Sequence, residues 1–265
     1  MHTRTVRAAA AAAAMIVSGG LATASSANSA GSASSAREAP PAHAAAVGKV
    51  AIVQAVPKLS LTVTVDGEQV QQGVAEGSIV GPLDLEVGSH EIGFTDGSEE
   101  VTSTVEVAAG ESSDVVVHRP AEVGGPPVVS VYPTPDDPLD PGKARVLLAH
   151  TATTAPADVV VDGQTVFTNI ANGEFAQADV AAGAHEVSLL PAGVTGRPIL
   201  GPLDVTLEEG TITAVYAVGN PKDGSMDVIV RTTGATPSQA EPPTEIDTGS
   251  AGLVDQVRVW TFSAG

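Results

Sequence analysis

The stretch VAIVQAVPKLSLTVTVDG at residues 50–67 decides the fold, because it recurs without a gap as VLLAHTATTAPADVVVDG at residues 146–163. Both copies contain apolar and β-branched runs, and both end in a Val-Asp-Gly turn. A second repeat follows, in which DLEVGSHEI at 84–92 matches DVAAGAHEV at 179–187. Self-similarity of this kind predicts two copies of one small structural unit.

The first copy divides into seven short runs of β-type residues, separated by turn sequences such as Asp66-Gly67 and Gly88-Ser89. The run Leu59–Val65 alternates apolar and polar residues, which predicts a strand with one buried and one solvated face. Short strands at this spacing, without helical periodicity, predict an antiparallel β-sandwich. The expected fold class is therefore all-β, with two tandem antiparallel β-sandwiches of Ig-like type. The seven runs are Val50–Val56, Leu59–Val65, Gln69–Val74, Leu83–Val87, His90–Phe94, Val101–Val107 and Asp114–His118.

Composition divides the chain into six expected segments. Proline fixes φ and neighbouring acids repel each other, so the Pro/Asp-rich segment predicts a semi-extended linker between units that fold separately. Two alternatives stay open: Val128–Tyr132 pairs as an edge strand, and Val257–Phe262 pairs with the second unit or hangs free. The segments are an export signal at 1–24, an Ala/Ser-rich spacer at 25–47, a divergent sandwich at 48–119, the linker at 120–142, a second sandwich at 143–232 and a flexible tail at 233–265.

The first 24 residues have the pattern of an export signal. Arg4 and Arg7 precede the apolar stretch Ala8–Val17, and Ala22-Thr23-Ala24 forms a small-residue cleavage site. The apolar stretch is shorter than the roughly 20 residues that span a bilayer. We therefore expect cleavage after Ala24 and a secreted or envelope-associated protein without a transmembrane segment in its mature form.

The chain contains no Cys, which excludes disulfides, thiol catalysis and Cys-based zinc sites. An exported chain of this kind, rich in Ala, Gly and Val and poor in Lys, is typical of a bacterium with a GC-rich genome. The formal net charge is −19, and the predicted cleavage removes Arg4 and Arg7 but no acid. Binding to nucleic acid needs clustered basic residues, so nucleic acid is excluded as an expected partner.

The pairs His90-Glu91 and His185-Glu186 are candidates for chemistry, because a His beside a carboxylate can act as a base or bind a metal. Neighbours on a strand point to opposite faces of the sheet, so neither pair can converge on one ion. Neither pair belongs to a His-Glu-x-x-His zinc motif. We therefore expect structural roles after a turn, with no catalytic and no metal-ligating residues.

Acidic residues occur in two other notable settings. Asp66-Gly67 and Asp162-Gly163 predict hairpin turns, in which both residues tolerate the left-handed region. Asp136, Asp137 and Asp140 offer carboxylates, the ligands that calcium prefers. Their spacing fits no EF-hand loop and prolines interleave them, so a linker is the better interpretation and no cofactor is expected.

The second unit contains the runs Ala144–His150, Ala155–Gly163, Ala182–Val187, Leu190–Gly193 and Tyr216–Gly219. Through these runs it resembles the DUF4397 family of secreted bacterial domains. The Gly-x-His-Glu turn also resembles PEGA-type surface modules. The first unit resembles DUF4397 more faintly, because Gln54 stands where His150 stands and Thr62 where Asp158 stands.

The family usually carries Ser-Pro-Asp after its His, whereas Thr151–Thr154 stand there in this chain. The resemblance implies a β-sandwich on the bacterial exterior and no established activity.

Known catalytic sequence patterns are missing. The chain has no Gly-x-Ser-x-Gly elbow, no phosphate loop and no dinucleotide fingerprint. We therefore expect a secreted or envelope-associated structural or interaction module without catalytic activity. The alternative is a module that binds an extracellular ligand or a cell-wall polymer, with a cell-wall or other extracellular component as its partner. A hydrolase with a dispersed catalytic set is a third, less favoured class.

Overall fold

The computed structural model describes residues 45–238, in which all regular elements are strands. The predicted export signal, most of the spacer and the segment Val257–Phe262 lie outside the described residues. The first half contains β1 (Val47–Ala55), β2 (Ser60–Val65), β3 (Glu68–Ala75), β4 (Ile79–Glu86), β5 (Gly88–Thr95), β6 (Glu100–Val107), β7 (Ser112–His118) and β8 (Val128–Pro133).

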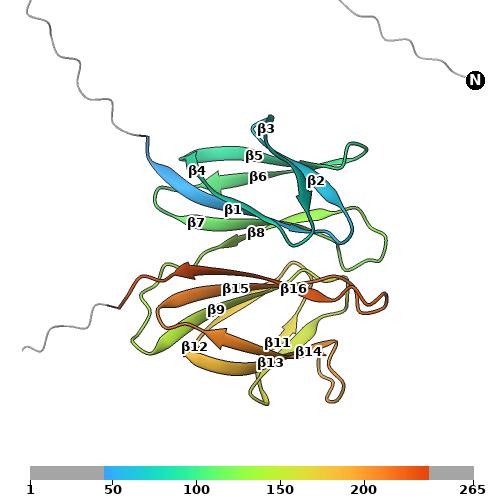
Figure 1. Ribbon diagram of the computed structural model, residues 1–265, viewed down its shortest axis with the longest axis vertical. Helices are drawn as coiled ribbons and strands as arrows, with labels where there is room; N and C mark the ends of the chain where they lie inside the picture. Colours follow the sequence, from blue (N-terminus) through green and yellow to red (C-terminus); the bar gives the residue numbers. More distant parts are fainter. Residues whose placement is uncertain (1–44, 239–265) are drawn as a thin grey trace, which may run out of the picture. The chain divides into compact units, whose positions relative to one another are not determined.

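These eight strands form the first sandwich (Figure 1). Sheet I has the strand order β3-β2-β5-β6, and sheet II has the order β4-β1-β7-β8. The hairpin of β2 and β3 turns at Asp66 and Gly67, whose φ angles are 51° and 79°. Positive φ at both central residues is typical of the tight turn that suits the twist of a hairpin, so the predicted turn is confirmed.

The second sandwich repeats this topology strand by strand. Sheet III has the order β12-β9-β15-β16 and sheet IV the order β11-β10-β13-β14, so each strand has a counterpart eight places earlier. The repeat predicted from the sequence is thus a repeat of complete sandwiches. The strands are β9 (Lys143–His150), β10 (Ala157–Val161), β11 (Gln164–Ile170), β12 (Phe175–Ala181), β13 (Gly183–Pro191), β14 (Leu200–Leu207), β15 (Thr211–Val218) and β16 (Asp227–Gly234).

The predicted all-β class with two sandwiches is confirmed, and each of the seven runs in the first copy falls on a strand. Two pairings differ from the antiparallel expectation, because β1 pairs with β7 and β9 with β15 in parallel. The chain crosses between the two sheets before it returns to the same sheet, which permits a parallel pair. The segment Val128–Tyr132 lies in β8, which pairs with β7, so the edge-strand alternative is confirmed.

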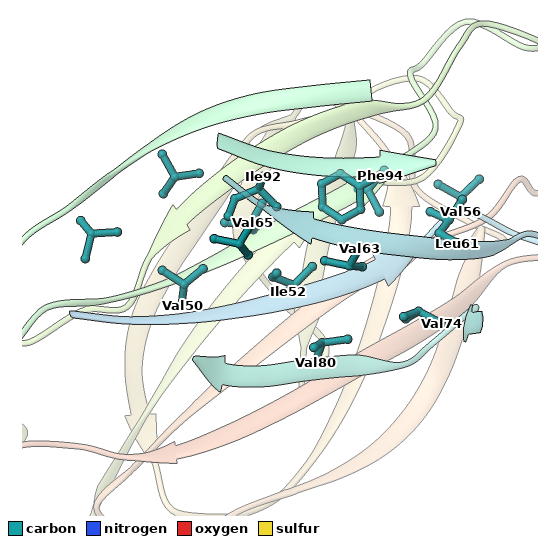
Figure 2. Packing of buried hydrophobic residues seen from close by; sticks show 14 residues of the cluster. Val50, Ile52, Val56, Leu61, Val63, Val65, Val74, Val80, Ile92 and Phe94 are labelled. Atoms are coloured by element: carbon teal, nitrogen blue, oxygen red, sulfur yellow. The ribbon is translucent and has the colours of Figure 1, made fainter. Parts of the chain in front are cut away.

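The core of the first sandwich lies between sheets I and II. Figure 2 shows Ile52 of β1 and Val63 of β2 in the space that Phe94 of β5 also enters. These three side chains are at most 2% exposed. Burying a side chain of this size stabilises the fold by about 1.5–3 kcal/mol relative to leaving it in water. The alternation predicted for Leu59–Val65 places Leu61, Val63 and Val65 in this core.

A second core lies between the two sandwiches, where sheet II packs on sheet III (Figure 1). Val53 and Val116 of sheet II lie in one cluster with Leu147 and Tyr216 of sheet III. Strands buried on both faces have continuous apolar runs instead of alternation, and Val50–Val53 is such a run. The two sandwiches belong to one compact unit.

A buried polar network crosses this second core. The hydroxyl of Tyr216 donates a hydrogen bond to the Asp114 carboxylate, and Arg231 Nη1 lies 2.9 Å from Asp114 Oδ1. The side chains of Asp114 and Arg231 are 4% and 11% exposed. Burial raises the pKa of Asp114, while the hydrogen bonds and the charge of Arg231 act in the opposite direction. Asp114 and Arg231 come from different sandwiches, so the network couples them.

We expect Asp114→Ala to destabilise the whole described unit by about 3 kcal/mol or more, because it leaves the Arg231 charge buried without its partner. Urea unfolding followed by circular dichroism measures this loss. The shared core predicts a single transition in the wild type, in contrast to the separately folding units expected from the linker.

The matched control is Asp84→Ala, which removes the exposed ion pair between Lys49 and Asp84 on the first sandwich. Their side chains are 59% and 60% exposed, and an exposed pair contributes about 0–1 kcal/mol. Equal losses in the two variants, or loss of the second sandwich alone in Asp114→Ala, would contradict the coupling.

Candidate functional site

The two repeated motifs of the sequence, Val-Asp-Gly and Gly-x-His-Glu, meet in the structure. In the first sandwich, His90 Nδ1 lies 2.7 Å from Asp66 Oδ2, and His90 Nε2 lies 2.8 Å from the backbone oxygen of Glu86. The second oxygen, Asp66 Oδ1, accepts a hydrogen bond from the backbone nitrogen of Glu91 at 2.9 Å. We call this arrangement the Asp–His brace, since it ties the β2–β3 turn to β5.

The second sandwich has the same brace. His185 Nδ1 lies 2.7 Å from Asp162 Oδ2, and His185 Nε2 lies 2.9 Å from the backbone oxygen of Ala181. The backbone nitrogen of Glu186 donates to Asp162 Oδ1 at 2.9 Å. The two histidine side chains are 15% and 13% exposed. Both members of each brace come from motifs that the sequence repeats, and the sequence did not reveal that they pair.

The chemistry of the braces follows from their hydrogen bonds. Each ring nitrogen of His90 and His185 faces an oxygen that can only accept, so the brace favours the imidazolium form, in which both ring nitrogens carry a proton. The bond to Asp66 is the largest cause of the raised pKa of His90, and it lowers the pKa of Asp66. Asp162 and His185 show the same shifts. A ring protonated at both nitrogens is neither a general base nor a metal ligand.

The glutamates of the two His-Glu pairs do not join their histidines. Glu91 and Glu186 contribute only backbone atoms: their nitrogens donate to the Asp carboxylates, and their oxygens accept from the backbone nitrogens of Asp66 and Asp162. In the segment that contains Asp136, Asp137 and Asp140, the backbone oxygen of Asp137 accepts a hydrogen bond from Arg145 Nη1 at 2.9 Å. Within residues 45–238, no group of three or more His, Asp and Glu side chains lies close enough to hold a metal ion.

The residues that carry the family resemblance make structural contacts. Asp158 of β10 accepts hydrogen bonds from the backbone nitrogens of Asn169 and Gly193, at 2.7 Å and 2.8 Å, and so ties β11 to the loop after β13. His150 is fully buried, and burial lowers its pKa. Its Nε2 lies 3.3 Å from the backbone oxygen of Ala155.

A cavity of about 70 Å³ lies between sheets III and IV of the second sandwich. All eight strands of this sandwich contribute to its wall. Its lining side chains are aliphatic except for Phe167 and His185, and both ring nitrogens of His185 are engaged in the brace. Val166 and Val230 line the cavity and are 40% and 49% exposed, so it reaches the surface. Such a cavity can accept an apolar group and offers it no hydrogen bond.

Sequence reasoning did not find this cavity. The sequence indicates the cavity only when the core residues of the two sandwiches are compared position by position, and matching these positions requires the strand register. Ala217 stands where the first sandwich has Val117, and Leu189 stands where it has Phe94. Both replacements remove volume from the centre of the sandwich.

Comparison with protein families places one match on this chain. A domain described as "Domain of unknown function (DUF4397)" is found at residues 48–157. The match covers the first sandwich and ends at the first residue of β10, whereas the sequence motifs pointed mainly to the second. No curated protein matches the chain. In the part of the chain that the structure describes, no helix is long and apolar enough to cross a membrane.

The braces predict a pH dependence of stability. The pKa of His90 and His185 is raised in the folded state. Their contribution to the free energy of unfolding is therefore fully present below the unfolded pKa of about 6.5, and it is lost as the pH rises through the folded pKa. The pKa of Asp66 and Asp162 is lowered in the folded state. Their contribution to the free energy of unfolding is therefore present above the unfolded pKa of about 3.8, and it is lost as the pH falls through the folded pKa. We therefore expect the free energy of unfolding to decline as the pH rises above about 6.5.

Urea titrations between pH 5 and 9 measure this decline, and the double variant His90→Gln/His185→Gln should lose most of it. His118 and His150 have lowered pKa values from burial, so they destabilise the fold below about 6.5 and add the opposite slope. The difference between wild type and double variant isolates the braces. Parallel curves for the two proteins would show that the braces do not titrate as described.

Gly183→Val tests the turn that precedes the second brace. The φ angle of Gly183 is 136°, a conformation that a β-branched residue adopts only with strain. We expect a loss of about 1 kcal/mol or more in urea unfolding. Ala184→Val, at the next and exposed position of β13, is the control and should be nearly neutral.

Proposed function

We propose that this protein is an exported bacterial module, free or associated with the cell envelope, that acts as a structural or interaction unit without catalysing a reaction. In this proposal the second sandwich is a further copy of the DUF4397 domain. The signal-peptide pattern with Arg4, Arg7 and Ala22-Thr23-Ala24 supports export, and the net charge of −19 suits an exposed compartment.

The observation that carries the proposal is the core shared by sheets II and III. Two sandwiches on a flexible linker would move independently, whereas a buried apolar core with the Asp114–Tyr216–Arg231 network fixes their relative orientation. A fixed pair of sandwiches holds its loops at a constant spacing, which is what a spacer or a two-site interaction module needs.

The braces support the same proposal. Histidine and carboxylate are the residues most often used for acid–base work, and here each pair serves to hold a hairpin turn against a neighbouring strand. The polar groups that the sequence repeats are thus engaged in maintaining the fold.

Ligand binding is the second candidate, and the cavity of the second sandwich is the observation that favours it. Binding to a cell-wall polymer would instead use exposed loops. Incubation of the purified protein with cell-wall fractions separates the structural module from the polymer-binding module, because only a polymer-binding module gives saturable binding to these fractions.

We expect the mature chain to begin near Ser25 and to occur in culture supernatant or envelope fractions of the producing cells. Mass spectrometry of these fractions measures the N-terminus. Ala24→Leu, which spoils the small-residue site, is the control and should accumulate uncleaved. An uncleaved wild-type chain confined to the cytoplasm would overturn both the proposed export and the proposed function.

A further inference from the structure

The second sandwich has an apolar cavity lined by all eight of its strands. The pocket of about 90 Å³ in the first sandwich lies beside the β5–β6 turn and includes the charged side chains Asp96, Glu99 and Arg119 in its lining. The strand register pairs each position of one core with its counterpart. At three matched core positions the second sandwich has the smaller residue: Ala178 for Leu83 on the edge strands β12 and β4, Leu189 for Phe94, and Ala217 for Val117.

Larger residues appear at other matched positions. Leu203 replaces Ser103 and Phe167 replaces Gln71 on strands β14 and β11, which are the two edges of sheet IV. Apolar side-chain volume is therefore distributed differently in the two sandwiches. The result is a hollow centre with apolar walls, and a well-packed protein interior normally lacks such a space.

The two sandwiches also differ in how closely their edges approach. In the first sandwich β6 lies close against β8 and β1 of the facing sheet, and β14 makes no comparably close approach to β16 or β9. Val228 and Val230 of β16 line the cavity at this edge. Val166 of β11 lines it at the opposite edge. The cavity therefore crosses the sandwich from one side towards the other.

The lining decides the chemistry of the occupant. Its only polar side chain is His185, whose two ring nitrogens are bonded to Asp162 and Ala181. A polar atom inside the cavity would have no partner, and burial without a partner is unfavourable. The part of the ligand inside the cavity must consist of carbon and hydrogen.

The shape decides between a chain and a ring. Strands lie roughly 4.8 Å apart, so a four-stranded sheet is about 14 Å wide. The cavity has a volume of about 70 Å³ and a lining that includes all eight strands, so it must be narrow to extend across this width. It suits an unbranched alkyl chain and is too thin for a sterol or another fused ring system.

We propose that the cavity between sheets III and IV binds an unbranched alkyl chain, with the polar head of the amphiphile at the surface beside Val230 or Val166. The chain net charge of −19 disfavours an anionic head, so the ligand is an uncharged or zwitterionic amphiphile. The alkyl chain comes from a free amphiphile or from a membrane lipid.

The test is isothermal titration of the full chain with decan-1-ol, in parallel with sodium decanoate. We expect saturable binding of one decanol per chain and binding of decanoate at least tenfold weaker. The cavity-filling variant Ala178→Leu/Leu189→Phe/Ala217→Val introduces the residues of the first sandwich and should weaken decanol binding at least tenfold. Val87→Ala, at an exposed valine of the first sandwich, is the matched control and should bind as the wild type does.

A second variant covers the case in which the filled core does not fold. Val230→Asp places a charge at the 49% exposed edge of the cavity and should also weaken decanol binding at least tenfold. Circular dichroism checks the fold of each variant. Absence of decanol binding to the wild type, or equal binding by wild type and folded variants, would overturn the proposal.

Flotation with phosphatidylcholine vesicles distinguishes the two sources of the chain. Binding to decanol without flotation identifies a free amphiphile, and flotation that Val230→Asp abolishes identifies a membrane lipid. Flotation that persists in Val230→Asp, together with unchanged decanol binding, identifies adsorption elsewhere on the surface and contradicts the cavity as the site.

Discussion

The packing of sheet II against sheet III is the contact on which the arrangement of the two sandwiches depends. A solitary sandwich exposes the outer faces of its sheets, whereas here β1, β7, β9 and β15 are buried on both faces. Apolar burial supplies the stabilisation, and the Asp114–Tyr216–Arg231 network restricts the register of the two faces. Matched positions in these outer faces differ: Val116 corresponds to Tyr216, and Tyr132 to Arg231. The two faces are complementary rather than identical.

The Asp–His braces, unlike the outer faces, are the same in both sandwiches: the same atoms form them at nearly the same distances. The Asp carboxylate accepts from a backbone nitrogen and from the His ring, while the ring also donates to a backbone oxygen. One pair of side chains therefore satisfies polar groups at the turn and at the start of the neighbouring strand. Repetition of a His and an Asp in this protein is explained by the geometry of a turn, without invoking catalysis.

The hydrophobic cores of the two sandwiches differ, whereas their braces are the same. The first sandwich packs Ile52 and Phe94 between its sheets and has a partly charged pocket beside the β5–β6 turn, whereas the second has a cavity with an almost entirely aliphatic lining. Duplication makes this divergence informative, because the first sandwich shows which side chains the same topology accepts. The joined faces support the proposal of a rigid two-sandwich module, and the cavity of the second sandwich supports the proposal of ligand binding.

The sequence alone determined the local structure: alternation at Leu59–Val65, the turns at Asp66-Gly67 and Asp162-Gly163, and the duplication itself. These features depend on neighbours in the chain, so period and turn chemistry suffice to find them. The continuous apolar run Val50–Val53 also carried the signal of a strand buried on both faces, although the Pro/Asp-rich segment suggested separate units. Only the tertiary structure decided the pairing of Asp66 with His90, the joining of the sandwiches and the cavity. Each of these depends on strand register and on the distance between sheets, which bring together residues far apart in the chain.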